Sequence, residues 1–322
     1  MQRRKLGLLD VSAIALGAPI YDVTTDAQIS ALLTRSFELG IDLIDTSDAY
    51  QGGLHEASVG RVLKGRRNMA VLATKFGNLR DKGGKPAGVN GRPDYVIEAC
   101  ERSLKTLDTD IIDLYYIHRI DPDVPIEDTV GAMAKLKSQG KIRHLGICEA
   151  APATLRRAHS AHPISALQTE YSLWSRDPEA ELLDVCAKLN IGFVAYSPLG
   201  RGFLTGAVTG TETMLNNDLR RSHPRFQPEN LQRNRALVDR MQALAKRQGC
   251  TAAQLAIAWL LRQRDFIVPV PGTRQVEYLD DNAGAAEITL GTETLAELDR
   301  IFAAGAVAGE RYPPGLMARV HI

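Results

Sequence analysis

The chain of 322 residues carries 39 lysines and arginines against 38 aspartates and glutamates, and 44% of its residues are hydrophobic. This balance leaves no excess charge that would attract nucleic acid or an acidic membrane, and no apolar run is long enough to span a bilayer. The basic N-terminus lacks the apolar core of a signal peptide, so we expect a cytoplasmic globular protein. We expect a single domain over residues 1–322, since α/β barrels often reach this size as one unit.

The spacing of the cysteines fits a reducing compartment. They stand far apart and form neither a CxxC motif nor a Cys/His cluster, so their pattern does not fit a metal site or a disulfide framework. The four residues are Cys100, Cys148, Cys186 and Cys250.

Short β-rich segments alternate along the chain with segments of helical periodicity. We predict strands at 13–16, 43–45, 71–75, 112–118, 143–148, 166–169, 192–196 and 267–271. We predict helices between them at 28–39, 54–63, 96–107, 126–139, 153–160, 178–189 and 252–263. Eight alternations of this kind favour a parallel sheet that closes into a (β/α)8 TIM barrel, an α/β fold.

An open doubly wound sheet is the structural alternative. Its dinucleotide fingerprint would follow the first strand, but the glycine there, Gly17, is not part of a GxGxxG motif. Three segments exceed a minimal barrel. A hairpin at 3–11 is suited to plugging the barrel floor, a polar loop at 206–232 is a candidate lid, and an extra helix is predicted at 231–248.

Four ionisable side chains lie at or just beyond the ends of predicted strands, where a buried strand would normally continue with apolar residues. They are Asp45, Tyr50, Lys75 and His118. Taken singly, each has an ordinary interpretation as a turn residue, a surface aromatic, a solvated charge or a structural histidine. The carboxyl ends of barrel strands meet on one face, however, so the four side chains should meet in one pocket.

Together these groups could transfer a proton. A phenol has a pKa of about 10, and a nearby ammonium favours the phenolate and lowers that value. Asp45 would keep Lys75 charged and in place, and His118 would hydrogen-bond a substrate carbonyl. We therefore expect Tyr50 to act as the proton donor in a catalytic group with Asp45, Lys75 and His118.

At this point the chain resembles the aldo-keto reductase superfamily over essentially its whole length. The pair Asp45 and Tyr50 and two short segments resemble the catalytic tetrad of that family; the segments are Ala73-Thr74-Lys75 and Tyr115-Tyr116-Ile117-His118. The resemblance implies an oxidoreductase that reduces aldehydes, and possible ketone substrates, to alcohols with hydride from NADPH, without a metal.

Further segments resemble the cofactor-binding parts of that family. The flat ring of Tyr196 suits stacking on a nicotinamide, and the resemblance places Gln168 and Cys148 near its carboxamide. Cys148 stands where relatives usually carry serine, and a thiol is a weaker hydrogen-bond donor than a hydroxyl. A loop rich in backbone amides is suited to the pyrophosphate, and it comprises Ser197, Pro198, Leu199, Gly200, Arg201 and Gly202.

The segment after the last predicted strand is suited to the adenosine end of the cofactor. Gly272, Thr273 and Arg274 begin a predicted helix there, and a guanidinium matches the geometry of a 2′-phosphate. We therefore predict a preference for NADPH over NADH. Asp281 and Asn282 resemble the pair that contacts adenine in the family.

The substrate is less well defined. The loops at 17–23 and 50–53 and the side chain of Trp174 should border its entrance, and Arg119 would either make that rim cationic or pair with a nearby aspartate, Asp121 or Asp123. We expect a small aldehyde or ketone as the partner, and a monomer or weak homodimer. Two alternatives are a regulatory subunit that senses NADPH with little turnover, and a Schiff-base lyase that uses Lys75 as a neutral amine.

Overall fold

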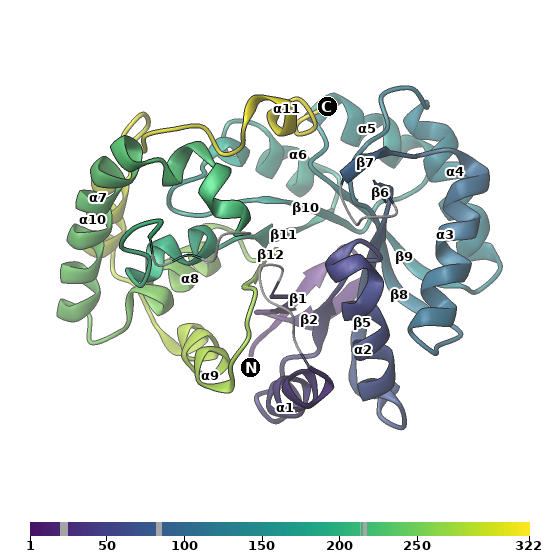
Figure 1. Cartoon of the computed structure of the whole chain (residues 1–322), viewed down its shortest axis with the longest axis horizontal. Coiled ribbons are helices and arrows are strands. Elements are labelled where there is room, and N and C mark those ends of the chain that lie inside the picture. Colours follow the sequence, from purple (N-terminus) through teal and green to yellow (C-terminus); the bar gives the residue numbers. More distant parts are fainter. Residues whose placement is uncertain (20–24, 82–85, 213, 215–217) are drawn as a thin grey trace.

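The computed structural model describes residues 1–19, 25–81, 86–212, 214 and 218–322. Within these residues, eight neighbouring strands run parallel in one sheet (Figure 1). They are β3 (Leu16–Gly17), β4 (Leu43–Asp45), β5 (Val71–Phe76), β8 (Ile112–Ile117), β9 (Ile142–Cys148), β10 (Ala166–Glu170), β11 (Gly192–Tyr196) and β12 (Ile267–Val270).

Backbone hydrogen bonds join the first and last strands of this sheet. The amide of Ala15 donates to the carbonyl of Pro269 at 2.9 Å, and the amide of Thr273 donates to the carbonyl of Gly17 at 3.2 Å. The sheet therefore closes on itself, and the predicted (β/α)8 barrel is confirmed.

Helices surround the strands on the outside of the barrel (Figure 1). In the described part of the chain they are α1 (Asp26–Glu38), α2 (Leu54–Leu63), α3 (Pro93–Thr106), α4 (Ile126–Ser138), α5 (Pro152–Ala161), α6 (Leu182–Lys188), α7 (Pro228–Arg247), α8 (Ala252–Gln263), α9 (Val276–Gly284), α10 (Thr292–Ile301) and α11 (Pro314–Met317). Capping boxes begin α1, at Thr25 and Gln28, and α8, at Thr251 and Gln254. Among the described helices, none is both long enough and apolar enough to cross a membrane.

Both faces of the barrel sheet are buried, which explains why its strands read as nearly continuous apolar runs. Leu43, Leu114 and Val194 belong to a cluster inside the barrel, whereas Ile44 and Phe193, their neighbours in sequence, pack outward against the helices. This alternation is the period of two that strand geometry imposes.

An antiparallel hairpin of β1 (Arg3–Leu6) and β2 (Leu9–Ser12) confirms the predicted N-terminal hairpin. Leu6 and Val11 are fully buried and belong to the cluster inside the barrel. A Cβ atom at Gly192 would lie 2.4 Å from the Cα of Leu6, so glycine at this position is needed for the hairpin to approach β11. The hairpin thus plugs the barrel beside the N-terminal ends of its strands.

Several predicted boundaries differ from the structure. The predicted strand at 13–16 contributes only its last residue to the β3 ladder, and the helix predicted at 178–189 begins at Leu182, after a separate 3-10 turn η3 (Asp177–Glu179). A hairpin of β6 (Asn78–Arg80) and β7 (Pro86–Val89) was not predicted. Parts of the predicted substrate and lid loops, at 20–23, 213 and 215–217, lie outside the described residues.

Candidate active site

The four predicted catalytic side chains come together at the C-terminal end of the barrel. Lys75, at the end of β5, is completely buried, and its Nζ forms an ion pair with Asp45 at the end of β4. The same Nζ donates to the Thr46 carbonyl at 2.8 Å and to the Tyr50 hydroxyl at 3.2 Å. Ion pair and phenol are thus connected through one ammonium group.

The environment of Lys75 keeps its side chain charged. Burial penalises the ammonium form, but the negative charge of Asp45 and its hydrogen bond to Lys75 oppose that penalty, and the pKa of Lys75 lies above its ordinary value. A Schiff-base lyase needs a neutral lysine, so this environment argues against the lyase alternative.

Tyr50 begins the 3-10 turn η1 (Tyr50–Gly53), in which Gln51, Gly52 and Gly53 all adopt positive φ angles of 53°, 66° and 89°. Two glycines suit this turn because they enter the left-handed region without steric cost. Burial raises the pKa of the Tyr50 hydroxyl above its ordinary value, and the opposing attraction of Lys75 is the smaller effect. The prediction of a lowered pKa was therefore wrong in sign, and the phenol holds its proton at neutral pH.

His118 lies against the edge of Tyr50, with 5.7 Å between the two ring centroids. Its Nδ1 lies 3.1 Å from the Oγ of Ser47. Burial, reinforced by the charges of Lys75 and Arg119, lowers the pKa of His118 well below its ordinary value. The imidazole is therefore neutral, and when Ser47 donates to Nδ1 the ring proton lies on Nε2, which can donate to a carbonyl oxygen.

Gln168 and Cys148 face the barrel interior beside this group. The Nε2 of Gln168 donates to Asp45 at 3.0 Å, on the carboxylate oxygen that Lys75 does not contact. Burial raises the pKa of the Cys148 thiol to about 12, so it stays protonated. Gln168 therefore orients Asp45, a role that the sequence did not indicate.

The segments predicted to bind the cofactor follow two neighbouring strands. Tyr196 at the end of β11 pairs in register with Val270 of β12, so the residues that follow these strands lie side by side. Tyr196 is partly exposed, and its hydroxyl lies 3.0 Å from that of Tyr312. Ser197 has a positive φ of 50°, a strained conformation typical of functional sites.

The predicted pyrophosphate loop makes contacts within the protein. Arg201 is buried, and its Nη2 lies 2.7 Å from Glu170. The amides of Gly200 and Gly202 donate to the carbonyls of Ser197 and Leu199 at 2.9 and 3.0 Å. Pro198 lies in the same turn, which leads into η4 (Gly200–Thr205). The amides of Gly200 and Gly202 and the guanidinium of Arg201 are thus engaged within the protein, and phosphate binding by this loop stays a prediction.

The adenosine-end residues surround the start of α9. Gly272 and Arg274 are exposed, whereas Thr273 is buried and its Oγ1 accepts from Asn282 at 3.4 Å. Asp281 accepts a hydrogen bond from Thr251. The segments at the ends of β11 and β12 therefore carry a partly exposed aromatic ring, hydroxyl and amide groups, and an exposed guanidinium. The chemistry of these groups fits a nicotinamide dinucleotide.

Two polar residues of α2 support the site and were missed in the sequence. The Nδ1 of His55 lies 2.9 Å from Thr46 Oγ1, and Glu56 accepts from Thr74 Oγ1 at 2.7 Å. Both are buried. Their position on the inward face of an amphipathic helix, where apolar residues are the rule, was the signal that could have identified them.

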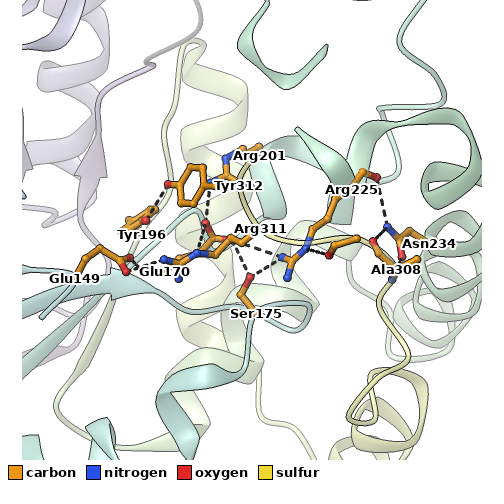
Figure 2. Close-up of polar contacts among 11 residues, drawn as sticks. Glu149, Glu170, Ser175, Tyr196, Arg201, Arg225, Asn234, Ala308, Arg311 and Tyr312 are labelled. Atoms are coloured by element: carbon orange, nitrogen blue, oxygen red, sulfur yellow. Dashed lines mark hydrogen bonds and ion pairs between the residues drawn. The ribbon is translucent and has the colours of Figure 1, made fainter. Parts of the chain in front are cut away.

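Figure 2 shows a second polar group on the same face, which we call the arginine–glutamate network. Glu170 is within ion-pair distance of Arg201, Arg225 and Arg311, at 2.7, 3.7 and 3.8 Å. Glu149 pairs with Arg311 at 2.6 Å. The network joins the ends of β9 and β10 to η4, to the segment before α7 and to the C-terminal tail.

The sequence predicts that Trp174 borders the substrate entrance. In the structure it lies beneath this region instead. It is buried and stacks on Phe203 with ring centroids 4.9 Å apart. A Cβ atom at Gly200 would lie 2.6 Å from the Trp174 ring, so the loop rests directly on the indole.

Residues 13–303 match the Aldo/keto reductase family. The chain is 45% identical to "Probable aldo-keto reductase 1" of Glycine max over 287 residues, which cover 89% of this chain and 82% of that protein. Among solved structures, it is similar to the glycerol dehydrogenase AKR11B4 from Gluconobacter oxydans, with a TM-score of 0.85, 29% identity and 94% of each chain covered. The holo form of aldo-keto reductase AKR11C1 from Bacillus halodurans gives a TM-score of 0.77 at 29% identity, covering 96% and 98% of the two chains.

These matches place the barrel in the class of oxidoreductases that act on carbonyl compounds. The chain is a member of the aldo/keto reductase family, which confirms the resemblance noted from its motifs. Enzymes of this family generally use a nicotinamide cofactor and act on small carbonyl substrates.

Proposed function

We propose that this protein reduces aldehydes, and also ketones, to alcohols with NADPH, and that Tyr50 is the proton donor. The observation that carries the proposal is the hydrogen bond from the Lys75 ammonium to the Tyr50 hydroxyl, with Asp45 paired to the same ammonium. This arrangement places a protonated phenol beside a fixed positive charge.

The proposed mechanism follows from the charges of these groups. NADPH, when bound, supplies the hydride that no side chain can supply. Neutral His118 donates a hydrogen bond to the carbonyl oxygen and orients it. Tyr50 gives its proton to that oxygen as negative charge develops there, and the Lys75 ammonium stabilises the phenolate that remains.

Cofactor binding is assigned by the chemistry of the available groups. Tyr196 offers a ring face for the nicotinamide, and Gln168 and Cys148, which are register partners on β10 and β9, would contact its carboxamide. Arg274 is an exposed guanidinium at the start of α9, which suits a 2′-phosphate and supports NADPH over NADH.

The test is the loss of NADPH absorbance with 4-nitrobenzaldehyde, comparing this protein with Tyr50→Phe and with Tyr95→Phe as a matched control. Tyr95 lies on α3 and stacks on Arg102, so its hydroxyl has no part in the proposed chemistry. We expect Tyr50→Phe to lose turnover by roughly 10²–10⁴-fold, the usual contribution of a positioned proton donor.

Near-full turnover in Tyr50→Phe would reject this assignment of the donor. Tight NADPH binding without turnover in any of the three proteins would instead support a regulatory subunit that senses the cofactor.

A further inference from the structure

A cavity of about 160 Å³ opens on the C-terminal face beside the active site. Its walls come from the β6–β7 hairpin, from Arg119 after β8 and from the C-terminal tail around α11, whose ribbon lies at the same edge of the barrel as β6 and β7 (Figure 1). The lining residues are Asn78, Leu79, Arg80, Gly88, Arg119, Tyr312, Leu316 and Arg319.

The lining of this cavity is strongly cationic. It contains three arginines, Arg80, Arg119 and Arg319, and the described residues that line it include no carboxylate. Leu79, Leu316 and the ring of Tyr312 supply apolar wall between the charges. Such a lining suits a small molecule with an apolar body and an anionic end.

Of the three arginines that line the cavity, Arg119 is the one next to a predicted catalytic residue. It directly follows His118, and its Nη1 donates to the His118 carbonyl at 2.8 Å. Of its two predicted alternative partners, Asp121 instead accepts hydrogen bonds from the backbone amides of Gly91 and Asp123.

Arg119 and Arg319 also differ from the other arginines of this face. Arg201, Arg225 and Arg311 are all within ion-pair distance of a glutamate. Across residues 1–19, 25–81, 86–212, 214 and 218–322, no carboxylate lies within ion-pair distance of Arg119 or Arg319. Glu149 favours the charged form of Arg119 from beyond ion-pair distance, so the direct hydrogen-bonding partner that an anionic ligand would supply is still missing from both guanidinium groups.

We propose that this cavity is an anion subsite of the substrate pocket, and that the substrates this protein favours are small aldehydes that also bear a carboxylate. The proposal rests on the reductase function proposed above. Arg119 and Arg319 would hold the carboxylate, for which a guanidinium fork is geometrically matched, while the carbonyl of the same molecule reaches Tyr50 and His118.

The experiment compares kcat/KM for 4-carboxybenzaldehyde with that for its neutral methyl ester, methyl 4-formylbenzoate. We expect this protein to prefer the acid by about tenfold or more, in line with charge-assisted hydrogen bonds. Arg119→Gln and Arg319→Gln should each reduce that ratio severalfold, and Arg119→Lys should retain part of it. Arg240→Gln, which removes an exposed charge from α7, should keep the original ratio.

The possible outcomes distinguish a failure of the anion subsite from a failure of the proposed reductase function. If neither aldehyde is reduced, the reductase function fails. If both are reduced with equal kcat/KM, the reductase stands and the anion subsite is wrong. The subsite is also wrong if Arg119→Gln and Arg319→Gln raise the KM for NADPH and lower kcat/KM equally for both aldehydes, because the arginines would then serve the cofactor. Arg319 lies on the tail, so its variant decides the matter if Arg119→Gln fails to fold.

Discussion

Asp48 lies beside the catalytic group, in the loop between β4 and Tyr50. Burial, together with the negative charge of Glu56, raises the pKa of Asp48 from 3.8 to about 7. A carboxyl whose pKa is higher in the folded protein binds its proton more tightly there than in the unfolded chain. It therefore stabilises the fold fully below pH 3.8, and this stabilisation is lost as the pH rises through about 7.

We predict that Asp48→Asn stabilises the protein at pH 8 but not at pH 5, because asparagine removes a carboxylate that is costly to ionise in place. The expected gain at pH 8 is on the order of 1–2 kcal/mol, after allowance for solvent screening. Urea unfolding at both pH values measures the difference. A gain that is the same at pH 5 and pH 8 would show that Asp48 does not titrate in this range.

The residue types of the catalytic group could be predicted from the sequence, but their proton affinities could not. Strand-end positions bring Asp45, Lys75 and His118 to one face wherever eight parallel strands close, so their meeting follows from topology. The raised pKa of Tyr50 depends on how much water the folded pocket excludes, and no motif encodes that amount.

At the scale of elements, the arginine–glutamate network holds the C-terminal tail to the barrel. Arg311 and Glu149 are both buried, so removal of one partner leaves a charge without compensation. We predict that Arg311→Met lowers the free energy of unfolding by roughly 3–5 kcal/mol and exposes the tail to proteolysis. Arg300→Met, at an exposed position of α10, is the control.

A double variant tests whether this loss comes from the pair. Combining Glu149→Gln with Arg311→Met should lower the free energy of unfolding by less than the sum of the two single effects. Each substitution removes the buried charge that the other would leave without a partner. Strictly additive losses would contradict the proposed coupling.

The loop over Trp174 gives a second prediction at this scale. Because Gly200 and Gly202 donate to carbonyls of their own loop, binding of a cofactor phosphate should rearrange the backbone that rests on the Trp174 ring. We expect NADP+ to change the tryptophan emission of Trp259→Phe, in which Trp174 is the remaining indole of the two in the chain. Saturable NADP+ binding by calorimetry without any emission change would contradict a loop rearrangement.

Sequence periodicity predicted most elements because both faces of the barrel sheet are buried and each helix packs one face on it. It missed the β6–β7 hairpin, because the residues of β6 are partly or fully exposed and do not alternate between buried and exposed positions. It also missed the network, because Glu149 and Arg311 are 162 residues apart in the sequence and only folding brings them together.

At the scale of the whole molecule, the N-terminal hairpin stabilises the barrel by filling its floor. We predict that Leu6→Ala lowers the free energy of unfolding by about 2–5 kcal/mol, because a fully buried leucine leaves a cavity inside the barrel. Leu8→Ala changes the same hairpin at a position that is 84% exposed, and should alter stability by no more than about 0.5 kcal/mol. Equal effects of the two substitutions would mean that the hairpin is not a plug.

The position of Arg311 also sets an order of events during synthesis. The ribosome makes Glu149 and Glu170 long before the arginine that pairs with both, and 162 residues separate Glu149 from it. At about 5–20 residues per second, the carboxylate of Glu149 waits on the order of ten seconds for this partner. A nascent chain in which all the barrel strands have been made therefore still lacks Arg311, Tyr312 and Arg319. The arginine–glutamate network and the wall of the adjacent cavity form only when this tail has been synthesised and has packed against the barrel.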